Sequence, residues 1–101
     1  MHKQQIEQLS VDRYGVVGDL SFDSVVDVEK EGFAVINEGG KQVTLDLSQV
    51  QACSSAAMAL LLSWLRYASK QQKNLIFSGV PASLRAMIKG AQLDNLFTMQ
   101  N

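Results

Sequence analysis

The sequence predicts a single α/β domain: a mixed β-sheet with helices packed mainly on one face. Short segments in which every second residue is apolar alternate with longer segments whose apolar residues recur at helical spacing. Their order is β-β-α-β-α-β-α, and this alternation favours a layer of helices over a sheet. The chain has no internal repeat and no linker, so we expect residues 1–101 to form one domain.

Composition indicates an ordinary globular protein. The chain is 47% hydrophobic and 19% charged, which suits a folded domain with one core. Its formal net charge is −1 and no block of like charge occurs, so nucleic acid is not an expected partner. The longest apolar run falls short of the roughly 20 residues that a membrane helix needs. A single cysteine and no recognisable signal peptide favour a cytoplasmic protein.

The N-terminal part is expected to contain two strands and a helix. We expect residues 1–5 to be frayed, and residues 6–9 and 14–17 to form strands. A helix over residues 21–37 is expected to begin with Ser21 or Asp23 as its cap. Its predicted apolar positions are Phe22, Val25, Val26, Phe33 and Ile36.

The centre of the chain is a strand followed by a long helix. Residues 43–47 alternate between apolar and polar, and helical spacing continues from about Ser55 to Lys70. Ser54 or Ser55 is the expected N-cap, because a hydroxyl there can accept a hydrogen bond from an unpaired N–H of the first turn. Capping alone would explain both serines; a role in regulation or partner binding is the alternative.

The C-terminal part is expected to add a strand and a helix. Residues 74–78 predict the strand, and Pro81 suits the first turn of the helix, where its missing N–H would be unpaired anyway. The apolar face of that helix consists of Leu84, Met87, Ile88 and Ala91. Residues 93–97 predict a short final strand or a turn.

The long central helix carries two apolar stripes. One is the expected core face, and the other lies on the opposite side. The core face consists of Met58, Leu61, Leu62, Leu65 and Ala68. The second consists of Leu60, Trp64 and Tyr67, with Ala56 one turn before Leu60. Either the same chain covers the second stripe or it docks another protein, and we favour docking.

No residue pattern indicates catalysis. A hydrolase needs a nucleophile with a base beside it, and the only histidine, His2, lies in the terminus that we expect to be frayed. Cys53 lacks a histidine partner too, which favours a small, partly buried residue over a nucleophile. Asp46 is expected to accept hydrogen bonds from loop N–H groups as a structural residue. No cluster has the spacing of a metal site, so we expect neither a metal nor a cofactor.

Two segments resemble the signature of STAS domains: DLSQV at residues 46–50 and SSAAM at residues 54–58. In that family a "vvlDlsxv" strand is followed by Asp-Ser/Thr-small-Gly-Leu and an Ala/Leu-rich helix. The similarity spans residues 14–97 and implies the STAS fold. Ser55 occupies the position of the Ser/Thr that is phosphorylated in anti-sigma-factor antagonists. Ser54 replaces the family's Asp, which argues against a kinase-driven switch.

Within the family, residues 46–68 are most similar to MlaB-type subunits of the Mla phospholipid ABC transporter. The resemblance implies a non-catalytic cytoplasmic subunit, peripheral at the inner membrane. It would bind an MlaF-like ATPase, and through it an MlaE-like permease, and support assembly and activity in maintaining outer-membrane lipid asymmetry. The alternative is an anti-sigma-factor antagonist regulated by phosphorylation of Ser55. Candidate partner-binding residues are Gln51, Cys53, Ser54, Ser55, Ala56, Leu60, Trp64, Tyr67 and Arg85, with Lys89 as a further rim residue.

Overall fold

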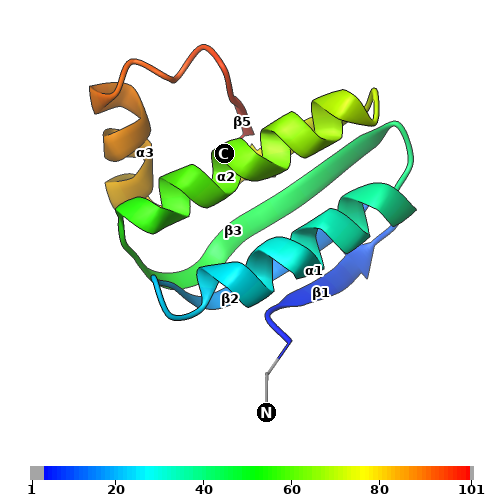
Figure 1. The fold of residues 1–101 in the computed structure, drawn as a ribbon, viewed down its shortest axis with the longest axis horizontal. Coiled ribbons are helices and arrows are strands. Elements are labelled where there is room, and N and C mark those ends of the chain that lie inside the picture. The colour runs from blue at the N-terminus through cyan, green and yellow to red at the C-terminus, as the bar shows by residue number, and fades with distance from the viewer. Residues whose placement is uncertain (1–3, 101) are drawn as a thin grey trace.

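Five strands and three helices make up the fold in the computed structural model, which describes residues 4–100 (Figure 1). The elements are β1 (Ile6–Ser10), β2 (Arg13–Leu20), α1 (Val25–Glu38), β3 (Gln42–Cys53), α2 (Ser55–Lys70), β4 (Asn74–Ser78), α3 (Ala82–Gly90) and β5 (Thr98–Gln100). The predicted order is confirmed. Residues 93–97 form a turn, one of the two expectations for that segment, and the short strand β5 follows it.

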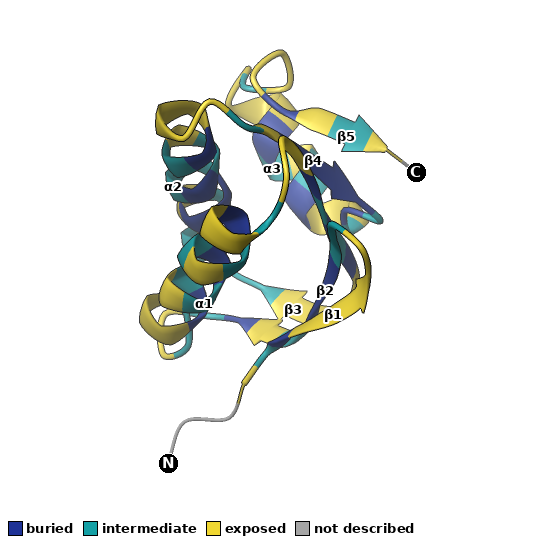
Figure 2. Cartoon of the chain, turned by 90° about the vertical axis from the view of Figure 1, so that its right-hand side faces the viewer, coloured by how far each residue is buried: buried dark blue, intermediate teal, exposed yellow. Residues whose placement is uncertain are grey.

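The strands form one mixed sheet in the order β1-β2-β3-β4-β5. β1 runs antiparallel to β2, whereas β2 to β5 are parallel to one another. Because successive parallel strands are added in one direction, right-handed crossovers place their helices on the same face. Helices α1 and α2 accordingly lie side by side over one face, and α3 packs beside α2 (Figures 1 and 2). The predicted arrangement of sheet and helices is confirmed.

Strand β3 lies at the centre of the sheet and is longer than the predicted residues 43–47. It has 12 residues. Its first half pairs with both neighbours, so Leu45 lies opposite Tyr14 and Phe77. Its second half pairs with β2 alone and ends at Cys53. Most residues there are exposed, because only one neighbouring strand continues alongside, and the apolar alternation that identifies a strand is therefore weaker.

The hydrophobic core lies between the helices and the face of the sheet that they cover (Figure 2). The largest fully buried side chains include Trp64, Phe77, Ile6, Leu20, Ile36, Leu45, Leu47, Leu61, Leu84 and Ile88. They come from all three helices and from four of the strands. One continuous core therefore holds the sheet and the helices together.

Helix α2 buries the apolar stripe that was predicted to dock a partner. Trp64 is completely buried and Leu60 is only 4% exposed. The Trp64 Nε1 donates a hydrogen bond to the backbone oxygen of Glu29 in α1 at 3.1 Å. The indole lies against Gly32, where any Cβ atom would overlap it. The prediction that Trp64 is an exposed anchor is wrong, because α1 covers it.

Tyr67 continues this contact with α1. Its ring packs against Phe33 with the centroids 4.6 Å apart, and Tyr67 is half-buried. In contrast, part of the predicted core face is only partly buried, namely Met58, Leu62 and Leu65. The helix is thus rotated relative to the prediction, and the alternative that the same chain covers the second stripe is confirmed.

Helix α1 begins later than predicted and faces the core with different residues. Neither Ser21 nor Asp23 is its cap. The N–H of Val25 donates to the backbone oxygen of Ser21 at 3.0 Å, which forms a turn before the helix. This start places Val28, Gly32 and Ile36 against the core. The predicted core positions Phe22 and Val26 are instead 71% and 61% exposed.

Side-chain contacts hold the start of the described chain. The Glu31 carboxylate in α1 accepts hydrogen bonds from the backbone N–H groups of Gln5 and Ile6, at 2.8 and 3.0 Å. The Gln5 Nε2 donates to the backbone oxygen of Val17 at 3.0 Å. Of residues 1–5, for which fraying is expected, Gln5 makes these contacts, while residues 1–3 lie outside the described residues.

Candidate protein-docking site

A one-residue loop joins β3 to α2. Ser54 occupies it, between Cys53 and Ser55. The Ser54 Oγ accepts a hydrogen bond from the N–H of Ala56 at 3.2 Å, while its own N–H donates to the backbone oxygen of Leu20 at 3.1 Å. The predicted cap is confirmed as Ser54. Ser55 is exposed in the first turn, and its hydroxyl has no hydrogen-bond partner within the described chain.

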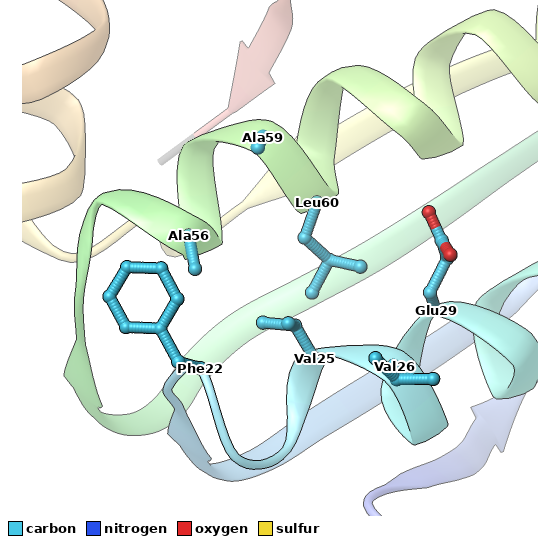
Figure 3. A pocket seen from close by; sticks show the side chains of 7 residues that line it. All are labelled: Phe22, Val25, Val26, Glu29, Ala56, Ala59 and Leu60. Atoms are coloured by element: carbon cyan, nitrogen blue, oxygen red, sulfur yellow. The ribbon is translucent and has the colours of Figure 1, made fainter.

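An open apolar groove lies beside this loop, between the N-terminal halves of α1 and α2 (Figure 3). It encloses about 310 Å³. Its lining consists of Phe22, Val25, Val26, Glu29, Ala56, Ala59 and Leu60. The groove is open because Ala56 and Ala59 are too small to fill it and because Phe22 and Val26 project into solvent. Exposed apolar surface of this kind is typical of interaction sites.

Glu29 forms the polar end of the groove. Figure 3 shows its carboxylate at the end opposite Phe22. The carboxylate accepts a hydrogen bond from the Ser63 hydroxyl, and the backbone oxygen of Glu29 accepts one from the Trp64 indole. Glu29 forms no ion pair with any residue that the structure describes. The groove therefore combines apolar walls with one fixed carboxylate.

The other predicted site residues do not line the groove. Cys53 faces α3, with its Sγ 3.7 Å from the Ser83 Oγ. Gln51 is exposed near the end of β3. Arg85 and Lys89, both in α3, line a separate hollow of about 430 Å³. The loop and groove thus bring together Ser54, Ser55, Ala56 and Leu60, and leave outside Gln51, Cys53, Trp64, Tyr67 and Arg85.

Five groove residues were not predicted as site residues: Phe22, Val25, Val26, Glu29 and Ala59. Three of them had been assigned to the core face of α1. A sequence signal could have corrected this, because Val28, Gly32 and Ile36 form an alternative stripe at i, i+4 and i+8. A glycine in such a stripe indicates close approach of a neighbouring element, here Trp64.

Asp46 belongs to a polar network on the face of the sheet away from α1 and α2. The Arg13 Nη2 donates to the Asp46 Oδ2 at 3.0 Å and to the Ser78 Oγ at 3.1 Å. The Asp46 Oδ1 accepts from the N–H of Ser48 at 2.9 Å. Burial raises the pKa of Asp46, but hydrogen bonds from Ser48 and Arg13 and the Arg13 charge outweigh burial and hold this pKa below its ordinary value. Asp46 thus accepts a backbone N–H as a structural residue, but from Ser48 within β3 and not from a loop.

Within the described chain, no group of three or more His, Cys, Asp or Glu side chains is arranged to bind a metal ion. Between residues 4 and 100, no helix has both the length and the hydropathy that crossing a membrane requires. What distinguishes the groove is exposed apolar surface next to Ser55 and Glu29.

The sequential sheet, the helices on one face and the serine-capped loop before α2 define a STAS domain. The chain belongs to the STAS family described as Mlab, STAS domain, whose model matches residues 7–99. The predicted resemblance to MlaB-type STAS domains is confirmed. A search of curated protein sequences finds no match.

Solved structures share the fold. The anti-sigma factor antagonist SpoIIAA of Bacillus has a TM-score of 0.69 at 14% identity, covering 96% of this chain and 86% of SpoIIAA. A sulfate transporter family protein from Wolinella succinogenes has a TM-score of 0.67 at 24% identity, covering 87% and 71%. The protein TM1081 from Thermotoga maritima has a TM-score of 0.77 at 15% identity, covering 100% and 83%. At these identities the similarity concerns the fold.

Proposed function

We propose that this chain is the non-catalytic STAS subunit of an ABC-type phospholipid transporter of the Mla class. It binds the ATPase subunit, and through it the permease, on the cytoplasmic side of the inner membrane. There it supports assembly and activity of the complex in maintaining outer-membrane lipid asymmetry. The match of the Mlab family model over residues 7–99 carries this proposal.

The groove is the docking surface that we assign to the ATPase. Phe22 and Val26 project apolar side chains into solvent, and Leu60 belongs to the α2 wall of the same groove. Covering these side chains with a protein surface removes apolar area from water, which favours association. Ser55 lies at the same end of α2, so a bound ATPase would also contact the loop. We therefore propose the groove as the docking surface instead of the face with Trp64 and Tyr67, which the sequence predicted.

Co-purification of the tagged chain with the transporter ATPase, co-expressed from the same genome, tests the proposal. The two variants to compare are Val26→Asp, in the groove, and Val11→Asp, in the β1–β2 turn at the other end of the domain. Both replace an exposed valine by a charge. We expect the wild type and Val11→Asp to retain the ATPase, and Val26→Asp to weaken binding about 30-fold or more, as for the central residues of an interface. Equal retention by both variants would place the contact elsewhere.

A second candidate function is that of an anti-sigma-factor antagonist regulated by phosphorylation of Ser55. The observation that favours it is the exposed Ser55 hydroxyl, which has no hydrogen-bond partner within the described chain. A SpoIIAA structure in the phosphorylated form is among the similar folds. Mass spectrometry of the protein from its native cell distinguishes the two functions. Phosphorylated Ser55 together with a bound kinase supports the second, and unmodified Ser55 in a complex with an ABC ATPase supports the first.

A further inference from the structure

We infer that the groove binds an amphipathic helix of the partner, with apolar side chains over Val26 and Leu60 and a lysine or arginine beside Glu29. The inference rests on the proposed function, since the ATPase is the protein expected to supply this helix. To the proposed function it adds the conformation of the partner segment that the groove binds and the sign of that segment's charge.

The chemistry of the groove walls favours a helix over an extended segment. All lining side chains except Glu29 are apolar and offer no hydrogen bond. An extended segment would leave the N–H and C=O groups that face these walls unpaired, whereas a helix satisfies its backbone groups internally. The small side chains of Ala56 and Ala59 let a helix approach α2 closely. Grooves of this type bind the apolar face of amphipathic helices.

The charge of Glu29 selects a basic residue at one end of that helix. The Ser63 hydroxyl holds the carboxylate in place but leaves it negatively charged, and no described residue forms an ion pair with it. A partner that covers the groove removes water from this carboxylate, and an unpaired carboxylate would then be strongly destabilising. A lysine or arginine compensates this loss, and an aspartate or glutamate at the same place would be repelled.

The spacing of the groove residues sets the spacing of the bound residues. Val25 and Glu29 are four residues apart on α1, which is about one helical turn. The basic residue of a helix lying along the groove is therefore expected about one turn from its apolar anchors. The predicted motif is a run of apolar residues at i, i+3 and i+4, with lysine or arginine in the adjacent turn.

Synthetic helical peptides test the inference directly. Each carries leucines at i, i+3 and i+4, and one matched set places lysine, the other glutamate, at each position of the adjacent turn. Their affinities are measured for the full chain as wild type, Glu29→Gln and Glu29→Lys, with Val11→Asp as the control. We expect the wild type to bind the best lysine peptide about fivefold more tightly than its glutamate counterpart, as for a partly exposed ion pair. Glu29→Gln should abolish the preference and Glu29→Lys should reverse it, and Val11→Asp should keep it.

The reversal is the decisive result, because a merely structural role of Glu29 would weaken both peptide sets equally. Failure of the wild type to bind any peptide, or a preference that Glu29→Lys leaves unchanged, would overturn the inference. The ATPase assay separates this failure from that of the proposed function. An ATPase that is lost from Val26→Asp but held equally by wild type and Glu29→Lys would sustain the function and overturn the inference. A charge reversal with peptides, but no ATPase binding, would sustain helix recognition and overturn the function.

Discussion

The helix pair α1–α2 is closed at one end and open at the other. Toward the C-terminal ends of the helices, the Trp64 indole fills the space above Gly32, and the Tyr67 ring packs against Phe33 at a tilt. Toward the N-terminal ends, alanines such as Ala56 face the first turn of α1 and leave the groove. A single stripe of α2 is thus part of the core at one end and part of the surface at the other.

This difference shows that the pairing of side-chain sizes, not the apolar pattern alone, decides which part of a helix is available to a partner. A large residue opposite a glycine closes the helix pair, and a small residue opposite a valine leaves it open. In the sequence, apolar residues occur at helical spacing at both ends. The docking surface that we propose lies where apolar residues lack a partner of matching volume within the chain.

The largest effect is expected for Trp64→Ala, which removes the side chain that closes the helix pair. Its loss leaves a cavity over Gly32 and removes the hydrogen bond from the indole to the backbone oxygen of Glu29. We expect the free energy of unfolding to fall by about 3–5 kcal/mol. Urea unfolding followed by circular dichroism measures this. A loss below about 1 kcal/mol would mean that the closed end contributes little to the fold.

The next effect concerns Lys73, which secures the same end of α1. Its Nζ donates to the backbone oxygens of Ile36, Asn37 and Gly39, at 2.6, 2.9 and 2.7 Å. Lys73→Met removes these charge-assisted hydrogen bonds at the helix C-terminus, and we expect a loss of about 2 kcal/mol in urea unfolding. Lys70→Met, at an exposed position, is the matched control, with a change below about 0.5 kcal/mol. Equal losses would show that Lys73 does not cap α1.

A smaller effect on stability is expected for Asp46, which pairs with Arg13 on the face of the sheet away from the helices. The pKa of Asp46 lies below its ordinary value of 3.8 in the folded protein. Its contribution to stability is therefore present above pH 3.8 and is lost as the pH falls through the lowered folded-state pKa. Because the Arg13 partner is partly exposed, this contribution should be below about 1 kcal/mol.

Unfolding of wild type and Asp46→Asn from pH 6 to pH 2 measures the contribution of Asp46. The advantage of the wild type should shrink toward the acid end, since only the wild type loses a charged group there. A difference between the two proteins that stays constant with pH would contradict the role of the carboxylate charge.

The fold could be predicted from the sequence because its signals are local. The alternation in residues 43–47 and the helical spacing after Ser55 identify β3 and α2 without knowledge of their neighbours. The order of the elements follows from the same local patterns, and the resemblance to STAS domains implies the fold that they form. The far half of β3 was missed because it pairs with β2 alone and is largely exposed.

The site could be predicted only in part, because it depends on how two helices meet. The loop residues Ser54 and Ser55 were found from capping chemistry, which is local. The orientation of Trp64 was missed because a stripe of large apolar residues looks the same whether the chain or a partner covers it. Gly32 indicates that a neighbouring element approaches α1 closely, but it does not say which side chain does so.

The smallest effect on stability is expected for Val26→Ala. Comparing it with Val28→Ala is the sharpest test of the open end of the helix pair. The two valines lie two residues apart on α1, with Val26 61% exposed and Val28 completely buried. Val26→Ala should change the free energy of unfolding by less than about 0.5 kcal/mol, whereas Val28→Ala should lower it by about 1–3 kcal/mol. Binding of the ATPase should respond in the opposite order, falling about fivefold for Val26→Ala and staying at the wild-type level for folded Val28→Ala. Similar stability losses for both variants would mean that α1 is buried on both sides and that the groove is closed in solution. The opposite ranking in the two measurements would show that one turn of α1 separates the surface that folds the domain from the surface that binds its partner.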